Sequence, residues 1–528
     1  MKANRILLVL LTAAVITGIV AACAPTAQQA PPAGTQAQAP VAAAGEPAAA
    51  PEQAAGRGVT LAIASETPSV APARHTALIG RLKNYLTHNG LFRPDYENLE
   101  PVPDVVASWR ALSDTLFEFT LHEGIMFHNG DEMTAYDVLA SLEYVRTYPY
   151  GVSVHGSAAS WDFVDRYTFT IDTGTPNAML FFDLAHHGNF LMPRSLIEAG
   201  HDFTVDPVGS GPFMFEEWRL GDSLTFRIFE EYFDRKRAPI LEYVTWRIIP
   251  EGASRTIALE TGEVDFVVDV AFPDIPRLRA NPDITVFERP GVTFSFFALN
   301  HDDPRFNVYV RRAVDMALDR EAMVMASLDG FGIPTAVTTP MFPGATTEGT
   351  RSFDPEGARA LLAEHGIDPA TLSFDMLIFE EPQRRRAEVA QSNLADIGIT
   401  TTITMMDFST WLTVAGTPDF ESAFGNFTGQ GNMLNFMRSV MHIDAIDSQN
   451  RSRTYNRELT DLIDRAIATI DADERVAILE QASRVANEYV VYIPTNVNIL
   501  FRAFNSSLIV PEIAANGAMP LNMAFWAE

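Results

Sequence analysis

A single cysteine constrains how this chain can be held together. Cys23 is the only cysteine in 528 residues, so no intramolecular disulfide can form and the fold must rest on burial of apolar side chains. Hydrophobic residues make up 47% of the chain and charged residues 20%, as is typical of a globular body. The residues after Cys23 suffice for about two or three domains. The cysteine count also excludes cysteine zinc sites and thiol catalysis.

The residues before Cys23 have the pattern of an export signal. Lys2 and Arg5 supply positive charge, and the apolar core over residues 6–20 is shorter than the ~20 residues that span a bilayer. Small residues then lead to the cysteine, so residues 1–22 are predicted to be a signal peptide. The final Val-Ala-Ala-Cys resembles the lipobox of bacterial lipoproteins. That resemblance implies cleavage before Cys23 and a lipid on its thiol; the alternatives are a single transmembrane anchor and a buried thiol.

Residues 23–58 are expected to form a flexible stalk. After Cys23 this stretch is almost entirely Ala, Pro, Gln and Gly, and its only charges are Glu46, Glu52 and Arg57. Such a composition cannot bury enough apolar surface to offset the entropy of ordering. We therefore expect an extracytoplasmic protein, lipid-anchored to a bacterial membrane in the periplasm or at the cell surface.

The charge and motif content exclude several functions. A formal net charge of -29 makes nucleic acid and anionic lipid surfaces poor partners. No lysine follows a glycine, so a GxxxxGK[ST] phosphate loop is absent, as are HExxH and GxSxG motifs. Ser210 lies between two glycines, but Pro212 follows directly, which favours a tight turn. We expect no cofactor, no metal site and no catalysis; a secreted hydrolase is a minor alternative.

Short strands and helices alternate along the rest of the chain, which indicates an α/β fold. Alternating apolar residues predict strands, and capping residues followed by apolar residues at helical spacing predict helices. The clearest predictions are strands over 59–64, 117–121 and 264–270, a capping box at Thr134 and Asp137, and helices over 253–261, 310–318, from Asp354-Pro355 to Gly366, and over 473–489.

Five ordered blocks, between about residues 58 and 500, resemble the extracellular solute-binding proteins, family 5, the peptide-type receptors of ABC importers. Each block alone is weak, but the order and spacing of all five are specific. The blocks are Trp109 with 117–121, 124–130 and 134–138; 207–213 with Trp218, Gly221 and 232–233; 255–265; 297–300 with 304–306, 310–313 and 317–320; and 353–355 with Ala358, 361–362 and Gly366.

The resemblance implies a two-lobed periplasmic-binding-protein fold with a hinge and an extra subdomain inserted in the first lobe. The lobes would close on ligand, and a membrane permease would read the closed form. The chain would cross between lobes near Leu299-Asn300 and Ile493-Pro494. The implied segments are lobe I over 59–93, 201–297 and 491–528, the inserted subdomain over 94–200, and lobe II over 298–490.

The stretch 424–432 resembles the segment in which peptide receptors carry an aspartate that pairs with the peptide's ammonium group. Gln430 stands at that position here, and no acid lies between Glu421 and Asp444. A buried ammonium without a carboxylate partner is costly. Either Asp407 or Asp419 is a candidate to supply the acid from a neighbouring loop.

The expected function is capture of peptides for an ABC importer. Aromatic rings and amides also suit an oligosaccharide or another neutral polar solute, so that cargo is the alternative on the same scaffold. A receptor that hands its ligand to a sensor kinase is a further, minor alternative. The candidate ligand contacts are Ser65, Glu66, Trp411, Phe424, Phe427, Gln430, Asn432 and Asn435.

Overall fold

The structure is a computed structural model of the whole chain. It divides into two units, Met1–Gln53 and Ala54–Glu528, and all described residues belong to the second. The predictions for Cys23 and Gln430 therefore lie outside the described residues. The described ranges are 58–66, 69–72, 78–147, 157–186, 188–337, 340–428 and 432–527.

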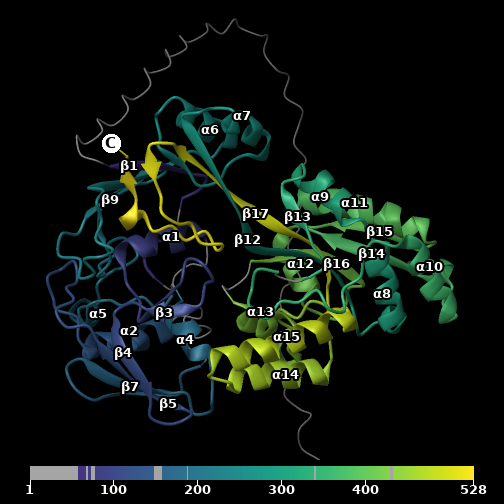
Figure 1. Cartoon of the computed structure of the whole chain (residues 1–528), viewed down its shortest axis with the longest axis horizontal. Coiled ribbons are helices and arrows are strands. Elements are labelled where there is room, and N and C mark those ends of the chain that lie inside the picture. The colour runs from purple at the N-terminus through teal and green to yellow at the C-terminus, as the bar shows by residue number, and fades with distance from the viewer. Residues whose placement is uncertain are drawn as a thin grey trace, which may run out of the picture. The chain divides into compact units, whose positions relative to one another are not determined.

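One mixed sheet forms the frame of the described chain (Figure 1). Its strands come from distant parts of the sequence, because the first strand lies between β10 and β11 and the long C-terminal strand β17 lies between β11 and β12. In spatial order the strands are β15 (Thr400–Met405), β14 (Ser373–Ile378), β16 (Ser422–Thr428), β12 (Ile284–Leu299), β17 (Ile493–Asn505), β11 (Phe266–Val267), β1 (Val59–Ile63), β10 (Tyr243–Ile248), β9 (Ser223–Ile228) and β8 (Phe213–Arg219), with β13 (Gly332–Pro334) beside β17.

Strands β12 and β17 are shared by both halves of this sheet and run side by side (Figure 1). β12 pairs with β16 only from Thr293 onward, while β17 pairs with β11 only at Ala503 and Phe504. The β12–β17 register shifts between Pro290 and Phe294. The crossings between lobes expected near Leu299-Asn300 and Ile493-Pro494 stay predictions; β12 ends at Leu299 and β17 begins at Ile493.

The predicted helix starts are confirmed. Thr134 and Asp137 form the capping box of α2, and Asp354 accepts a hydrogen bond from the Gly357 amide at the start of α10. The predicted strand over 264–270 is wrong in length, because only Phe266 and Val267 find partners on both sides. The described α-helices are α1 (Leu78–Thr87), α2 (Ala135–Arg146), α4 (Met179–Leu184), α5 (Arg194–Glu198), α6 (Gly252–Glu260), α7 (Ile275–Arg279), α8 (Val308–Ala317), α9 (Arg320–Leu328), α10 (Pro355–Glu364), α11 (Glu381–Asp396), α12 (Phe408–Val414), α13 (Met433–Val440), α14 (Arg457–Ala468) and α15 (Ala472–Tyr489).

A second, antiparallel sheet lies within the segment expected to be an inserted subdomain. Its core is aromatic: Phe117, Phe119 and Phe169 are fully buried, and the rings of Phe119 and Phe169 stack with centroids 5.4 Å apart. The limits of the subdomain stay a prediction. The strands are, in order, β4 (Val106–Ala111), β5 (Leu116–Leu121), β7 (Thr168–Asp172) and β6 (Ser160–Phe163); short two-stranded pairs are formed by β2 (Phe92–Pro94) with β3 (Pro101–Pro103) and by β18 (Leu508–Ile509) with β19 (Phe525–Trp526).

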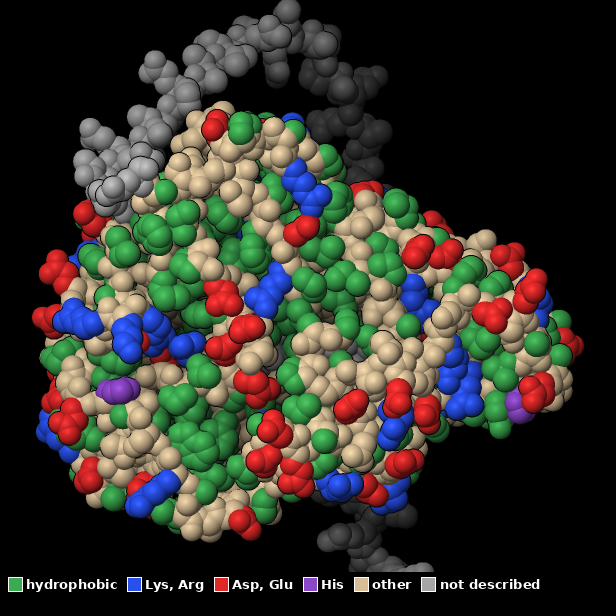
Figure 2. Space-filling view, viewed as in Figure 1, with side chains coloured by type: hydrophobic (Ala, Val, Ile, Leu, Met, Phe, Trp, Pro, Cys, Tyr) green, Lys and Arg blue, Asp and Glu red, His purple; other side chains and the backbone are tan. Residues whose placement is uncertain are grey.

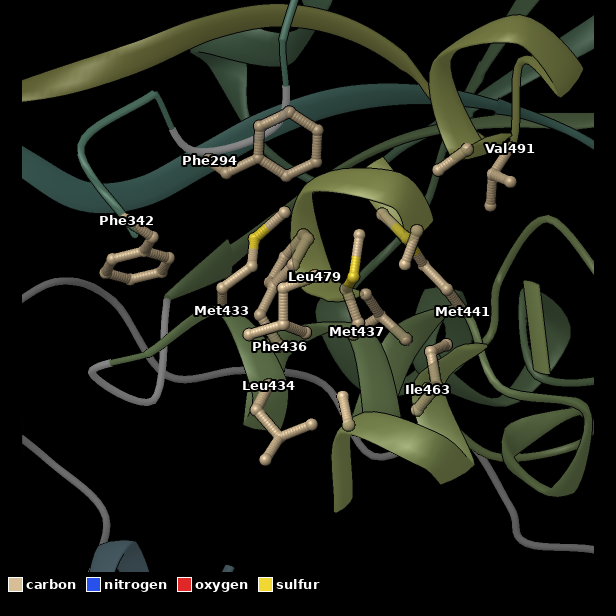
Figure 3. Close-up of a cluster of buried hydrophobic side chains, with 14 of the residues drawn as sticks. Phe294, Phe342, Met433, Leu434, Phe436, Met437, Met441, Ile463, Leu479 and Val491 are labelled. Atoms are coloured by element: carbon tan, nitrogen blue, oxygen red, sulfur yellow. The ribbon is translucent and has the colours of Figure 1, made fainter. Parts of the chain in front are cut away.

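Helices α13, α14 and α15 enclose an apolar cluster against β12 (Figure 3). Met433 and Met437 are one turn apart on α13 and buried, so they share the face that packs on Ile463 of α14 and Leu479 of α15. Phe294 of β12 packs edge-on against Phe436 of α13, with ring centroids 5.6 Å apart. This cluster supports the segment that follows β16.

Charged side chains of both signs lie on the face of the molecule that Figure 2 shows. Figure 2 shows acidic side chains scattered over the visible face with basic side chains among them, and no large patch of one sign. Among the helices of the described part of the chain, none combines the length and the apolarity that crossing a membrane requires.

Candidate functional site

The site is built where parallel strands end. β14 runs parallel to β15 and β16, and β1 runs parallel to β10 and β11. In open α/β sheets, ligands bind outside the carboxyl ends of such strands, where loops and helix starts converge. Ser65 and Glu66 lie just after the carboxyl end of β1, which is Ile63. Asn432 begins the helix that follows β16.

Glu66 is half-buried and already has structural partners. Its Oε1 accepts hydrogen bonds from Nε1 of Trp218 at 2.7 Å and from the Gly221 amide at 3.0 Å. These bonds hold the turn between β8 and β9 against the end of β1. Ser65 is exposed. Contact of these two residues with a ligand stays a prediction, and the geometry gives Glu66 a second role in positioning that turn.

Phe427 lies in an aromatic stack on one face of the sheet. Its ring stacks on Phe296 of β12 with centroids 4.5 Å apart and an interplanar angle of 22°. Tyr492 and Phe436 approach edge-on, at 5.7 Å and 6.1 Å. Because the side chain of Phe427 is only half-buried, part of the ring remains available beside this support.

The Trp411 ring lies on the same face of the sheet, against Gly425. A Cβ atom at Gly425 would lie 2.5 Å from Cζ of Phe296 and 3.1 Å from Cη2 of Trp411, so both rings occupy the space that a side chain would take. Trp411 is buried and also packs on Phe379 with centroids 4.8 Å apart. No described residue gives its Nε1 a hydrogen-bond partner. Trp411 and Phe427 therefore flank Phe296.

Phe424 lies on the opposite face, in the core. Its ring stacks on Phe297 with centroids 4.5 Å apart and is 1% exposed. Successive residues of a strand point to opposite faces, so Phe424 and Phe427, three positions apart, cannot share one. A contact between the Phe424 ring and a ligand would require this packing to open.

The two predicted asparagines help to form the start of α13. Oδ1 of Asn432 accepts a hydrogen bond from the Asn435 amide at 2.7 Å, which caps the helix, and Asn432 is 4% exposed. Oδ1 of Asn435 accepts a hydrogen bond from the Ser439 hydroxyl at 3.1 Å, and its side chain is half-buried. Asn435 is thus better placed than Asn432 to offer an amide to a solute.

Of the two acids suggested as substitutes at position 430, Asp407 already has hydrogen-bond partners, and a role for Asp419 stays a prediction. Asp407 caps α12 by accepting a hydrogen bond from the Thr410 amide at 3.0 Å, and it also accepts one from the Thr410 hydroxyl. The resulting hydrogen bonds lower the pKa of Asp407. Asp419 is exposed on the turn before β16. Asp407 is therefore engaged within its own helix.

The sequence analysis missed a polar group beside β16. Nδ2 of Asn426 donates a hydrogen bond to Oε1 of Glu380 at 3.2 Å, and Nη1 of Arg386 donates to Oδ1 of Asn496 at 2.9 Å. Asn426 and Asn496 both oppose Ser295 on β12, one from each side, so the three share a face of the sheet. Burial lowers the pKa of Arg386 to about 10, although Glu380 opposes this shift.

One signal in the sequence pointed to Glu380. It follows the apolar end of β14 and precedes Glu381-Pro382, the pattern of a strand, a loop and a helix start. Its partners lie 46 and 6 residues away in sequence, and nothing in the local pattern pairs them. Asn426 becomes a neighbour of Glu380 because β14 and β16 pair, whereas Arg386 lies on α11, the helix that Glu380 begins.

Ser210 is structural. It is buried, and its hydroxyl donates a hydrogen bond to Oδ1 of Asn89 at 3.3 Å. A Cβ at Gly211 would lie 2.4 Å from the Thr87 carbonyl carbon, so this turn packs directly on the end of α1. Within the described ranges, no three His, Cys, Asp or Glu side chains are grouped to hold a metal ion.

Relatives found by sequence are named for the solutes that they bind. Heme-binding protein A of Haemophilus influenzae is 26% identical over 449 residues, which cover 78% of this chain and 81% of that protein. Glutathione-binding protein GsiB of Salmonella typhimurium is 26% identical over 369 residues, which cover 67% of this chain and 70% of that protein.

Solved structures share the fold. HbpA2 from Haemophilus parasuis superposes with a TM-score of 0.82 at 21% identity, covering 89% of this chain and 100% of that one. The periplasmic binding protein DppA from Helicobacter pylori, in complex with the peptide STSA, superposes with a TM-score of 0.73 at 21% identity, covering 89% of this chain and 98% of that one. The predicted α/β, two-lobed periplasmic-binding-protein fold is confirmed.

A family profile that matches the sequence identifies the family of this chain. The profile of the bacterial extracellular solute-binding proteins, family 5 Middle, matches residues 100–444, which is more than half of the chain. The five blocks singled out by sequence fall largely within this range. The chain belongs to the bacterial extracellular solute-binding proteins, family 5, which are solute receptors of ABC importers and not enzymes.

Proposed function

We propose that this chain is a lipid-anchored extracytoplasmic receptor that captures short peptides between two lobes and delivers them to an ABC importer. The observation that carries the peptide cargo is the pairing of unlike surfaces on β16. The Phe427 ring lies on one face of the strand and the Asn426 amide on the other. A peptide presents both apolar side chains and amide groups, and it needs both kinds of surface.

Two comparisons support a peptide cargo. GsiB is named for glutathione, which is itself a small peptide, and the Helicobacter pylori neighbour holds the peptide STSA. In this proposal the lobes have the boundaries that the family resemblance implies. Closure would bend the chain at its two crossings between the lobes, near Leu299-Asn300 and Ile493-Pro494.

The proposed cargo is tested by identifying the small molecules that co-purify with the protein. Protein purified from its own host under native conditions would be denatured, and the released small molecules analysed by mass spectrometry. Peptides recovered from the protein, and absent from a matched preparation of Phe427→Ala, are the expected result. Recovery of oligosaccharides without peptides would contradict a peptide cargo.

A second candidate keeps the scaffold and changes the cargo to an oligosaccharide or another neutral polar solute. It is favoured by Gln430, a neutral amide at the position where the resemblance places an acid. Aromatic faces such as Phe427 with nearby amides also suit sugars. If this candidate is correct, Gln430→Asp leaves peptide affinity unchanged; a large gain in peptide affinity would favour the peptide receptor.

The lipid anchor is proposed from the sequence around Cys23. Growth of expressing cells with an alkyne-tagged fatty acid should label the wild-type protein and place it in the membrane fraction. Cys23→Ser should abolish the label and release the protein from that fraction. Equal labelling of both proteins would contradict lipidation at Cys23.

A further inference from the structure

The start of helix α4 contacts the end of helix α14 (Figure 1). The backbone N–H of Ala178, the residue before α4, donates a hydrogen bond at 2.7 Å to the carbonyl oxygen of Ile467 in the last turn of α14. The last carbonyl groups of a helix have no partner within that helix, so the start of α4 supplies one. The bond therefore joins two parts of the receptor that the family resemblance distinguishes, the inserted subdomain and lobe II.

Apolar side chains from both parts pack together at this contact. Leu99, on the turn between β2 and β3, and Ala178 are buried in the same cluster as Ile463 of α14. In return, Ile470, between α14 and α15, packs against the aromatic cluster of the subdomain that contains Phe119. Each part thus covers apolar surface of the other, which favours the contact over its separation in water.

A pair of opposite charges lies beside the apolar contact. Nη2 of Arg475, on α15, lies 3.6 Å from Oε2 of Glu100, and Cζ of Arg475 lies 5.6 Å from the centroid of the Phe182 ring. Nη1 of Arg475 also donates a hydrogen bond to the Ile470 carbonyl oxygen at 2.9 Å, which orients the guanidinium. The Arg475 side chain is 9% exposed and that of Glu100 31%. Burial raises the pKa of Glu100, and Arg475 opposes this rise, so the pair lies partly out of water.

The turn that carries Glu100 is held to the segments expected to form lobe I. Nη1 of Arg289, on β12, donates a hydrogen bond to the Tyr96 carbonyl oxygen at 3.1 Å, and Nη2 donates to the Glu97 carbonyl oxygen at 2.6 Å. Nη1 also donates to the carbonyl oxygen of Ile513, in the C-terminal segment, at 3.1 Å. Tyr96 and Glu97 lie on the same turn as Glu100. The contact of Glu100 with Arg475 therefore spans the two expected lobes.

We propose that this contact is a latch that stabilises the closed form of the receptor from outside the ligand site. The latch residues are Leu99, Glu100, Ala178, Ile467, Ile470 and Arg475, none of which is a candidate ligand contact. A contact between lobes separates when they open and forms again when they close. Stabilising the closed form raises its population, and with it the affinity for a cargo that the closed form binds. The inference rests on the two-lobed capture proposed above and not on the identity of the cargo.

The test measures distances across the latch with spin labels and double electron–electron resonance. Cys23 is the only cysteine, so the full chain with Cys23→Ser, Asp114→Cys and Asp461→Cys carries one label on each side of the contact. Both labelled positions are exposed, Asp114 on the turn between β4 and β5 and Asp461 on α14. Each protein is measured as purified under native conditions, and again after unfolding in urea and refolding to remove bound solutes.

The variants are Glu100→Arg, which places two cations together, and Ile470→Ser, which weakens the apolar contact. Glu97→Arg is the matched control, because it makes the same charge change at an exposed side chain of the same turn. The wild type and Glu97→Arg should share one distance distribution. Glu100→Arg and Ile470→Ser should each lower the ratio of short to long distances by about tenfold in at least one preparation.

Two outcomes would overturn the latch. Distance distributions that neither Glu100→Arg nor Ile470→Ser changes in either preparation, even with a lower urea midpoint, would make the contact ordinary packing within one rigid body. An equal shift in Glu97→Arg would assign the effect to net charge and not to the pair with Arg475. The cargo is identified separately by mass spectrometry, so failure of the latch would leave the proposed function in place.

Discussion

Arg386 on α11 donates a hydrogen bond to Oδ1 of Asn496 on β17 at 2.9 Å, and so joins a helix of one half of the sheet to a strand shared by both. Asn496 is fully buried and also donates to Oδ1 of Asn498 at 2.8 Å. The guanidinium depends on this amide, because its Nε has no partner among the described residues.

Asn496→Ala should therefore destabilise the fold by about 2–4 kcal/mol, since it leaves a buried cation without its acceptor. Urea unfolding gives the free energy. Asn498→Ala, which leaves the bond between Arg386 and Asn496 in place, should cost less. Equal losses in the two variants would show that the bond to Arg386 carries no special weight.

Phe427→Ala and Phe424→Ala form a matched pair on one strand. Phe427→Ala should weaken peptide binding and cost little stability, because the ring is only half-buried. Phe424→Ala should cost about 3–5 kcal/mol and leave the affinity of the folded fraction unchanged, because its ring is 1% exposed on the other face. Calorimetric titration and urea unfolding of both variants separate the effects. A loss of affinity in Phe424→Ala with none in Phe427→Ala would contradict the ligand contact proposed for Phe427.

Gly425→Ala tests the close approach of Phe296 and Trp411. A Cβ 2.5 Å from Cζ of Phe296 must displace one of the two rings. Overpacking of this kind costs about 1–3 kcal/mol, and the shifted rings should also weaken ligand binding. Gly366→Ala is not a suitable control, because Gly366 has a φ of +66°. An unchanged melting temperature in Gly425→Ala would contradict the packing.

Stability should fall as the pH drops below neutrality, in part through His128. Burial disfavours the charged imidazole and lowers the pKa of His128 from 6.5 to about 4, while Nε2 lies 3.0 Å from the Gly211 carbonyl oxygen. Between these values the unfolded chain binds the proton more readily than the folded chain. The His128 contribution is thus fully present above pH 6.5 and is lost toward pH 4, by up to about 3 kcal/mol.

His128→Gln supplies the control, because its amide can still donate to the Gly211 carbonyl but does not titrate. The unfolding free energy of each protein is measured by urea at pH 7 and pH 5. The variant should lose less stability over this interval than the wild type. The same loss in both proteins would assign the acid sensitivity to other groups.

Local features of the chain were predictable where a few neighbouring residues decide the structure. Asp354 followed by proline marks the start of α10, and the capping box at Thr134 marks α2. The site was predictable only in part. Phe427 and Trp411 were singled out by residue type, and their contact with a ligand stays a prediction; Phe424 was grouped with them although its strand parity places it on the other face.

The order in which strands pair in the sheet could not be predicted from the sequence. β11 was expected to be longer because its apolar run continues, but its length is set by β1 and β17, which pair with it over two residues. Glu380 was missed for the same reason. Its partner Asn426 is 46 residues away and becomes a neighbour only because β14 and β16 lie side by side.

The most direct measurement is a thermal-shift comparison of the purified protein with free-amine peptides, N-acetylated peptides and oligosaccharides. A ligand at 100 times its dissociation constant adds about 2.7 kcal/mol of stability, which is readily seen as a higher melting temperature. A peptide receptor should respond to peptides and much less to oligosaccharides. A shift with oligosaccharides alone would contradict the peptide function and leave the family fold with a different cargo.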